Sequence, residues 1–126
     1  MEKHIKRVKR ERMYKGTAID IYKDYMHFSN GNTEEWDYIH HRGAAAVLPV
    51  MEDGSFVMVH QYRNALERVM IELPAGGLES ADEPGIVCAA RELEEETGYR
   101  SDDLEWLITI RTSVALSNEK IEIYLA

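Results

Sequence analysis

Alternating apolar and polar side chains predict β-strands over much of the chain. Residues 13–41 alternate on both sides of one polar turn, Ser29-Asn30-Gly31-Asn32, which is typical of an antiparallel β unit of two or three strands. Residues 43–50 form an apolar run that predicts a buried strand, and residues 55–62 alternate again after the turn Glu52-Asp53-Gly54. Shorter apolar runs predict strands at 69–73, 104–111 and 121–125.

One helix is predicted between the strands at 69–73 and 104–111. Ser80 and Asp82 are candidate N-caps, Pro84 suits the first turn, and Gly98 is a natural residue after the last turn. Apolar positions recur at helical spacing and are predicted to face the core: Ile86, Ala90, Leu93 and Thr97. Strands before and after one central helix predict an α+β domain.

The composition is that of one globular domain. The 126 residues are 44% hydrophobic and 30% charged, which is not the balance of a disordered chain. The net charge of −8 argues against electrostatic binding to nucleic acid. No apolar run approaches the roughly 18 residues that a membrane span needs, and the charged N-terminus shows no secretory signal. A single cysteine, Cys88, fits a reducing compartment, so we predict a cytoplasmic protein with no nucleic-acid or membrane partner.

Basic residues are concentrated at the N-terminus, where residues 1–15 hold seven of the fifteen lysines and arginines. We interpret this segment as a solvated, partly frayed terminus, with contact to phosphate or an acidic partner as the alternative. The residues concerned are Lys3, Lys6, Arg7, Lys9, Arg10, Arg12 and Lys15.

Three glutamates of the predicted helix share one face. Glu92, Glu95 and Glu96 stand at positions i, i+3 and i+4, which lie close together at 3.6 residues per turn. Their like charges repel one another, and a divalent cation would neutralise the repulsion. Mg²⁺ prefers such hard oxygen ligands, and Mn²⁺ is an alternative. A solvated acidic helix face, screened by Arg91, is the competing interpretation.

The residues on either side of the glutamates favour the metal. Gly77 is followed by five residues and Glu83, and then by seven residues and the run Arg91-Glu92-Leu93-Glu94-Glu95-Glu96-Thr97-Gly98-Tyr99. This loop–helix–loop spacing resembles the signature of the Nudix hydrolase family. Tyr99 departs from it, because that position is usually a bulky aliphatic residue. The resemblance implies an α/β/α sandwich with a mixed β-sheet and the signature helix at its centre.

The resemblance also implies roles for the matched residues. Glu92, Glu95 and Glu96 match metal-binding, catalytic positions, and Arg91 matches the arginine that orients them. Glu83 would support the loop–helix geometry, and Gly77 and Gly98 would allow sharp loops. The implied cofactor is Mg²⁺, with Mn²⁺ as the alternative, and the bond cleaved would lie within a P–O–P bridge.

Segments before the signature resemble one branch of the family. Gln61-Tyr62-Arg63 and the run from Glu72 to Gly77 are similar to the ADP-ribose pyrophosphatases and their nucleotide-sugar relatives. The resemblance implies that the Ala75 carbonyl is a metal ligand and that Arg63 contacts substrate phosphate, which a bidentate guanidinium suits. It also implies that Glu119 contacts the terminal sugar, since a carboxylate accepts hydrogen bonds from neighbouring hydroxyls.

The N-terminal β unit is similar to an extension found in this branch. The resemblance implies that residues 1–42 form a sheet that is swapped across a homodimer and that residues 43–126 form the Nudix domain. Trp36 or Tyr38 would stack on the base, with core or dimer packing as the alternative. The adjacent His40 and His41 point to opposite faces of a strand and make a poor metal pair.

Two departures leave alternatives open. Val114 and Ala115 stand where ADP-ribose pyrophosphatases usually carry proline and glycine, and the sequence stops at Ala126, before the expected second helix and the loop that often holds the general base. The leading hypothesis is Mg²⁺-dependent hydrolysis of ADP-ribose or a related nucleoside diphosphate sugar to a nucleoside monophosphate and a sugar phosphate. The alternatives are hydrolysis of a dinucleotide or an oxidised nucleotide, and a catalytically weak nucleotide-binding module.

Overall fold

The computed structural model describes residues 4–126, which divide into two compact units. The first unit contains the N-terminal segment up to His41 together with Thr112–Glu119. The second unit contains Arg42–Arg111 and Lys120–Ala126. The first unit therefore includes a short loop from late in the chain in addition to the predicted N-terminal extension.

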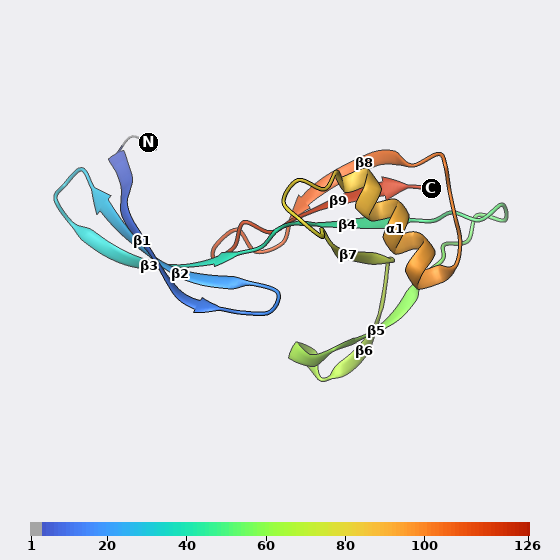
Figure 1. Ribbon diagram of the computed structural model, residues 1–126, viewed down its shortest axis with the longest axis horizontal. Coiled ribbons are helices and arrows are strands. Elements are labelled where there is room, and N and C mark those ends of the chain that lie inside the picture. Colours follow the sequence, from blue (N-terminus) through green and yellow to red (C-terminus); the bar gives the residue numbers. More distant parts are fainter. Residues whose placement is uncertain (1–3) are drawn as a thin grey trace. The chain divides into compact units, whose positions relative to one another are not determined.

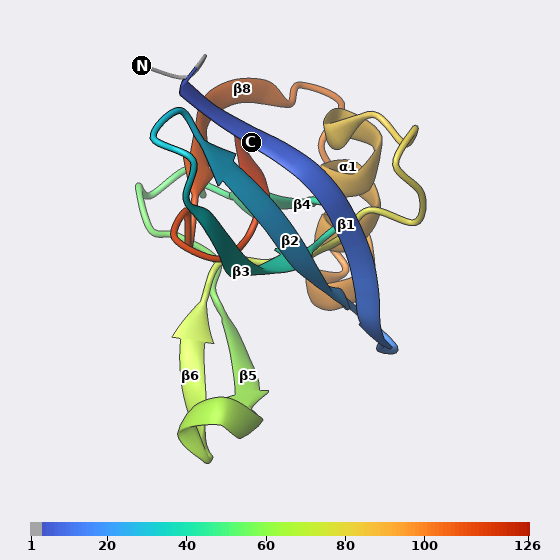
Figure 2. The ribbon, with the colours of Figure 1, turned by 90° about the vertical axis from the view of Figure 1, so that its left-hand side faces the viewer.

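The first unit is a three-stranded antiparallel sheet in the order β1-β2-β3 (Figure 2). Its strands are β1 (Ile5–Lys15), β2 (Asp20–Phe28) and β3 (Thr33–His40), and the predicted polar turn joins the last two. The interpretation of the basic segment as a frayed terminus is wrong for the described residues, because β1 pairs with β2 along its whole length. Lys3 lies outside the described residues.

One ion pair ties β1 to β2 in this sheet. Arg10 Nε lies 2.6 Å from one carboxylate oxygen of Asp24, and its second terminal nitrogen donates to the other oxygen at 2.8 Å. The Arg10 guanidinium also stacks over the ring of Tyr38 on β3. The Asp24 residue is 7% exposed, and hydrogen bonds from Arg10 hold the pKa of its carboxyl below the usual range.

This ion pair predicts an acid-sensitive first unit. Because the folded-state pKa of Asp24 is lowered, its stabilisation is present above the ordinary aspartate pKa of about 3.9 and is lost as the pH falls through the lower folded value. We expect the free energy of unfolding to fall by about 1–2 kcal/mol more in the wild type than in Asp24→Asn between pH 5 and pH 3. Trp36 fluorescence during urea unfolding, recorded in a Trp106→Phe background, measures this difference, and equal pH dependence in the two proteins would contradict the assignment.

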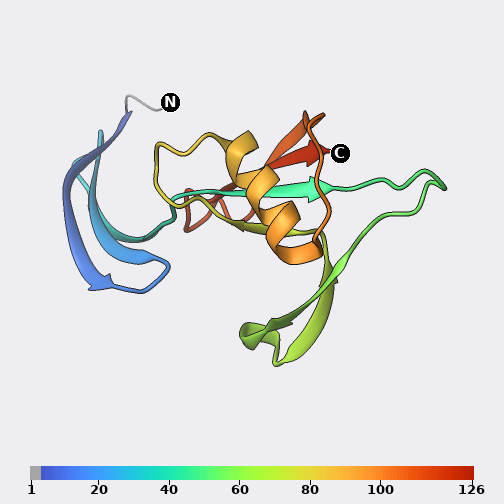
Figure 3. The ribbon, with the colours of Figure 1, turned by 45° about the vertical axis from the view of Figure 1, so that its right-hand side comes forward.

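The second unit contains a four-stranded mixed sheet in the order β7-β4-β9-β8. The strands are β4 (Ala44–Leu48), β7 (Ala75–Gly77), β8 (Glu105–Arg111) and β9 (Lys120–Leu125). β4 pairs in parallel with β9 and antiparallel with β7, while β8 pairs antiparallel with β9. One helix, α1 (Gly85–Thr97), lies against β4 and β7 on one face of the sheet (Figures 1 and 3).

This arrangement confirms the predicted α+β class, the mixed sheet and the single central helix. The second helical layer of the expected sandwich has no counterpart in residues 4–126. Within the same range, no helix is long and apolar enough to cross a membrane.

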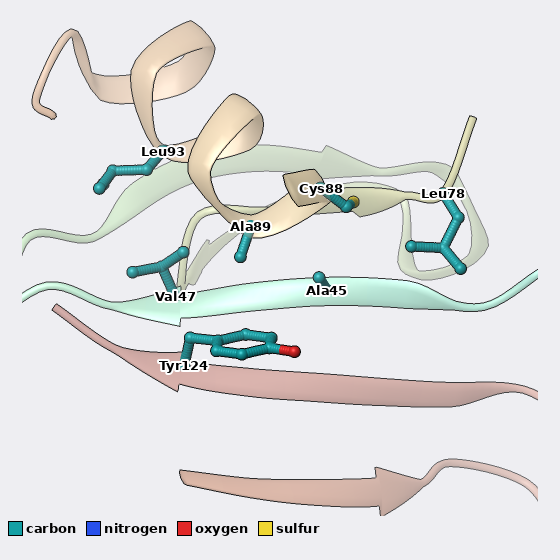
Figure 4. Close-up of a cluster of buried hydrophobic side chains, with 7 residues drawn as sticks. All are labelled: Ala45, Val47, Leu78, Cys88, Ala89, Leu93 and Tyr124. Carbon is teal, nitrogen blue, oxygen red and sulfur yellow. The ribbon is translucent and has the colours of Figure 1, made fainter. Parts of the chain in front are cut away.

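The core lies between α1 and the sheet (Figure 4). Small residues of β4, such as Ala45, let the helix approach the strand closely. The buried cluster consists of Ala45, Val47, Leu78, Cys88, Ala89, Leu93 and Tyr124. Leu93 is buried as predicted, but the prediction for Ile86 is wrong, because this side chain is exposed. The buried stripe is centred on Cys88 and Ala89, and Ile86 therefore lies beyond its edge.

The two ends of α1 differ from each other in how well they were predicted. Gly98 follows the helix with φ 78°, and its N–H donates to the Glu94 carbonyl, which confirms its predicted place. The N-cap is Pro84, which offers no side-chain hydrogen bond, so the prediction of Ser80 or Asp82 as the cap is wrong.

A separate two-stranded ribbon, β5 (Val59–Arg63) and β6 (Arg68–Glu72), extends from the second unit (Figure 3). The strand predicted at 55–62 is wrong for its first half, where Phe56 makes only an isolated bridge to Val50. The ribbon is amphipathic because alternate side chains point to opposite faces. Its more apolar face carries the exposed side chains of Tyr62, Val69 and Ile71 together with His60, and the opposite face carries Gln61, Arg63 and Glu72 together with Val59 and Met70.

Candidate active site

Two of the three predicted glutamates of α1, Glu92 and Glu96, are in contact, and the third, Glu95, is exposed. Glu92 is nearly buried, with a side chain that is 12% exposed, whereas the Glu95 side chain is 61% exposed. Glu96 shares a hydrogen bond with Glu92. Their position on the last turns of the helix follows from its regular spacing up to Gly98.

Arg91 fixes one side of this glutamate face. Its terminal nitrogens donate to Glu92 at 2.8 Å and to Glu83 at 3.0 Å, and its Nε lies 3.5 Å from a carboxylate oxygen of Glu79. Glu83 in turn accepts the Glu79 N–H at 2.9 Å. This backbone bond, followed by the Arg91 contact, lowers the pKa of Glu83, and hydrogen bonding to Glu83 raises the pKa of Arg91. The network joins the loop before α1 to the middle of the helix.

Strand β7 provides the opposite side of the site. A Cβ atom at Gly76 would lie 2.2 Å from the Glu92 carboxylate carbon, so the absence of a side chain at this position lets the carboxylate reach the strand backbone. A Cβ atom at Gly77 would meet only the Gly43 carbonyl oxygen, at 3.8 Å. Gly77 has no positive φ, so the expectation that it permits a sharp loop is not needed to explain the backbone here.

The electrostatics of Glu96 connect it to both neighbouring elements. Desolvation of its carboxyl group, then the hydrogen bond and negative charge of Glu92, raise its pKa. A hydrogen bond to the Ala75 main chain and the charge of Arg63 act in the opposite direction. Arg63 therefore lies near enough to influence the glutamates, although its own guanidinium forms a bidentate pair with Glu72 across the ribbon, at 2.8 Å through Nε.

The other predicted substrate residues belong to the first unit. Trp36 is half exposed and packs edge-on against Phe28, with ring centroids 5.8 Å apart. Trp36 and Tyr38 line a hollow of about 600 Å³ together with residues 114–118 of the late loop and three acidic residues: Asp24, Glu35 and Asp37. Glu119 ends the loop of this unit and lies beside His41.

Comparison with known proteins identifies the fold and the family. A model of the NUDIX domain matches residues 40–122, which is more than half of the chain. The chain belongs to the NUDIX family. The solved structure of an ADP compounds hydrolase has the same fold, with a TM-score of 0.85 at 20% identity over 97% of this chain and 66% of that one.

Two curated relatives match nearly the whole NUDIX chain. The methanol dehydrogenase activator of Bacillus methanolicus is 40% identical over 121 residues, and the ADP-ribose pyrophosphatase of Bacillus subtilis is 39% identical over 121 residues. Each match covers 96% of this chain and 65% of the relative. The chain thus spans about two thirds of the length of these relatives.

The NUDIX glutamates suit a divalent cation in their donor chemistry. The carboxylate of Glu96 lies beside the main chain of Ala75 and that of Glu92 lies beside Gly76, and carboxylate oxygens are hard ligands of the kind that Mg²⁺ accepts. Because Gly76 has no side chain, the Glu92 carboxylate has free space beside the strand backbone. Among residues 4–126, however, no three acidic, histidine or cysteine side chains are gathered as a metal-binding group.

Sequence reasoning missed several contributors to this NUDIX site. Glu79 pairs with Arg91, Glu72 pairs with Arg63, and Gly76 makes room for Glu92. Glu79 lies within the signature at a position without a fixed residue, so its spacing carried no signal. The Gly76-Gly77 pair was the available clue, since two consecutive glycines beside a helix indicate close approach of a backbone.

Proposed function

We propose that this NUDIX chain hydrolyses the pyrophosphate bridge of ADP-ribose or a related nucleoside diphosphate sugar, with Mg²⁺ as cofactor and Mn²⁺ as the alternative. The products would be a nucleoside monophosphate and a sugar phosphate. The observation that carries this proposal is that Glu92, which Arg91 holds by a hydrogen bond, and its neighbour Glu96 face the backbone of Ala75 and Gly76. A protein named ADP-ribose pyrophosphatase matches 96% of the chain at 39% identity, and this match supports the substrate class.

The proposed metal ligands are Glu92, Glu95, Glu96 and the Ala75 carbonyl. A divalent cation bound there would polarise a phosphoryl oxygen and lower the pKa of a coordinated water. Arg91 holds the Glu92 carboxylate by a charge-assisted hydrogen bond, so this ligand is oriented before the cation binds. The exposed Glu95 carboxylate lies 3.9 Å from the Arg91 nitrogen that also donates to Glu92, which supports its place in the proposed ligand set.

Different residues are proposed to contact the phosphate, the base and the terminal sugar of the substrate. Arg63 would bind phosphate by exchanging its bidentate partner, Glu72, for phosphate oxygens, which have the same fork geometry. Trp36 would stack on the base, since it is partly exposed in the lining of the hollow, where the carboxylates of Glu35 and Asp37 can accept hydrogen bonds from ring amino groups. Glu119 would bind hydroxyls of the terminal sugar.

We also propose a homodimer formed through the N-terminal β unit. A single three-stranded sheet buries little apolar surface, and in this unit Val8, Met13 and Tyr14 of β1 are exposed. The apolar face of the β5–β6 ribbon is a second unpartnered surface. The proposed compartment is the cytoplasm, supported by the single buried free thiol of Cys88.

The dimer is tested by introducing charge on these surfaces. We expect Val8→Asp and Ile71→Asp each to raise the dimer dissociation constant at least about a hundredfold, because a buried unpaired carboxylate is costly at an interface. Light scattering after size-exclusion chromatography measures the mass across a dilution series. The control is Val87→Asp, which makes the same change at an exposed position of α1. A wild-type monomer, or dimers that are unaffected by both changes, would contradict the proposal.

A substrate panel tests the proposed reaction. With Mg²⁺ present, we expect ADP-ribose to yield AMP and ribose phosphate faster than diadenosine polyphosphates or oxidised nucleoside triphosphates are cleaved. The second candidate is a nucleotide-binding module with weak catalysis. It is supported by the finding that, among the described residues, three potential metal-binding side chains do not already lie together. Calorimetry showing tight ADP-ribose binding, with no product after long incubation, would favour this module. Preferential cleavage of dinucleotides or oxidised nucleotides would redirect the substrate assignment.

A further inference from the structure

The loop Thr112–Glu119 of the first unit is fixed against the end of β3 by main-chain bonds. The Ile39 N–H donates to the Leu116 carbonyl at 2.7 Å, and the His41 N–H donates to the side-chain oxygen of Asn118 at 2.8 Å. The ring of His40 contacts the Asn118 amide nitrogen at 3.4 Å and the hydroxyl of Tyr38 at 3.0 Å. The two adjacent histidines therefore face different residues of the loop.

The last residue of this loop is held at both carboxylate oxygens. The hydroxyl of Thr112 donates to one oxygen of Glu119, and His41 Nε2 lies 3.3 Å from the other. The Glu119 N–H donates to the Ser117 hydroxyl at 3.0 Å, which fixes the main chain as well. The side chains of His41 and Glu119 are 20% and 28% exposed, so both are ordered by packing while Glu119 stays accessible.

From this geometry, we propose that His41 is a positioning residue, which with Thr112 orients the Glu119 carboxylate for the two neighbouring hydroxyls of the substrate's terminal sugar. This inference rests on the proposed function. A carboxylate has about four acceptor sites, and the two internal contacts leave one on each oxygen. Two acceptors held at a fixed separation match two hydroxyls on neighbouring ring carbons.

A purely structural ion pair is the competing explanation for these contacts. Such a pair would fasten the loop to β3 whatever ligand is bound. The loop already has its main-chain bonds to Ile39 and His41, and partly exposed ion pairs contribute little to stability. The His41 ring, with Nε2 3.3 Å from the carboxylate, is therefore placed to act on the orientation of Glu119.

A double-mutant cycle on the full chain separates the two explanations. We expect Glu119→Gln to raise KM for ADP-ribose about tenfold and His41→Leu about fivefold, with kcat within about twofold, since a contact to non-reacting hydroxyls contributes to binding. In the Glu119→Gln background, His41→Leu is expected to add less than about a further 1.5-fold. We expect His41→Gln, which keeps a donor near the Nε2 position, to recover most of the loss.

Control measurements keep the outcomes distinct. His27→Gln changes an exposed histidine of the same unit and is expected to leave both constants unchanged. An ADP alkyl ester lacks the terminal hydroxyls, so its KM should not respond to His41→Leu. The positioning role would be overturned if the two substitutions acted independently, so that their effects on KM multiplied in the double variant. It would also be overturned if KM for the alkyl ester rose as much as KM for ADP-ribose. Absence of turnover in the wild type would instead overturn the proposed function.

Discussion

We expect Glu96→Gln to lower kcat for ADP-ribose hydrolysis at least about a hundredfold at saturating Mg²⁺. The substitution keeps the shape of the side chain but removes the negative charge beside Glu92 on the last turns of α1. A neutral amide is a poor ligand for a hard cation, so the carboxylate pair would lose its affinity for metal. The effect is measured as the rate of AMP release, which is detected by chromatography across a Mg²⁺ titration.

Two further variants make this expectation specific. We expect Glu95→Gln to cause a similar loss, because its exposed carboxylate completes the proposed ligand set. Glu94→Gln removes the same charge from an exposed position of the same helix and should retain activity. Turnover near the wild-type value in both Glu95→Gln and Glu96→Gln would rule out the metal assignment.

Gly76→Ala is expected to lower turnover at least about tenfold while leaving the fold intact. The new methyl group would lie 2.2 Å from the Glu92 carboxylate carbon and would displace that side chain from the strand and from Arg91. The backbone at Gly76 does not occupy the left-handed region, so alanine brings no conformational strain. Loss of one oriented metal ligand accounts for the expected size of the effect.

The neighbouring glycine provides the matched control for this change. Gly77→Ala would place its methyl group 3.8 Å from its nearest neighbour, the Gly43 carbonyl oxygen, which is an ordinary van der Waals distance. Steady-state kinetics should therefore show loss of turnover for Gly76→Ala and not for Gly77→Ala. Thermal unfolding should show no loss of stability for Gly76→Ala. Equal turnover in the two variants would mean that Glu92 does not need the space at Gly76.

Periodicity predicted the elements whose partners are close in the sequence or whose spacing is regular. The helix, its end at Gly98 and the antiparallel pair around the 29–32 turn depend on local geometry, and the structure has all three. Residues 55–58 alternate like a strand but find no pairing partner beyond the bridge at Phe56. Pairing of strands is a long-range property, and alternation alone does not supply it.

The candidate site divides in the same way. The shared face of Glu92, Glu95 and Glu96 follows from helix geometry, whereas their different exposure depends on how α1 packs on β7. The contact between His41 and Glu119 joins the end of β3 to a loop near the end of the chain. The sequence contains both residues but no periodic pattern that relates them, so only the folded chain brings them together.

The buried cysteine of α1 can report how often the helix separates from the neighbouring strand β7. Cys88 is fully buried, its sulfur lies against the Gly76 and Gly77 carbonyls, and burial raises the pKa of its thiol to about 11. At neutral pH an alkylating reagent would find neither a thiolate nor a path to the sulfur. The rate of labelling would therefore measure how often the helix separates from β7, and a bound cation that joins the two elements would slow it.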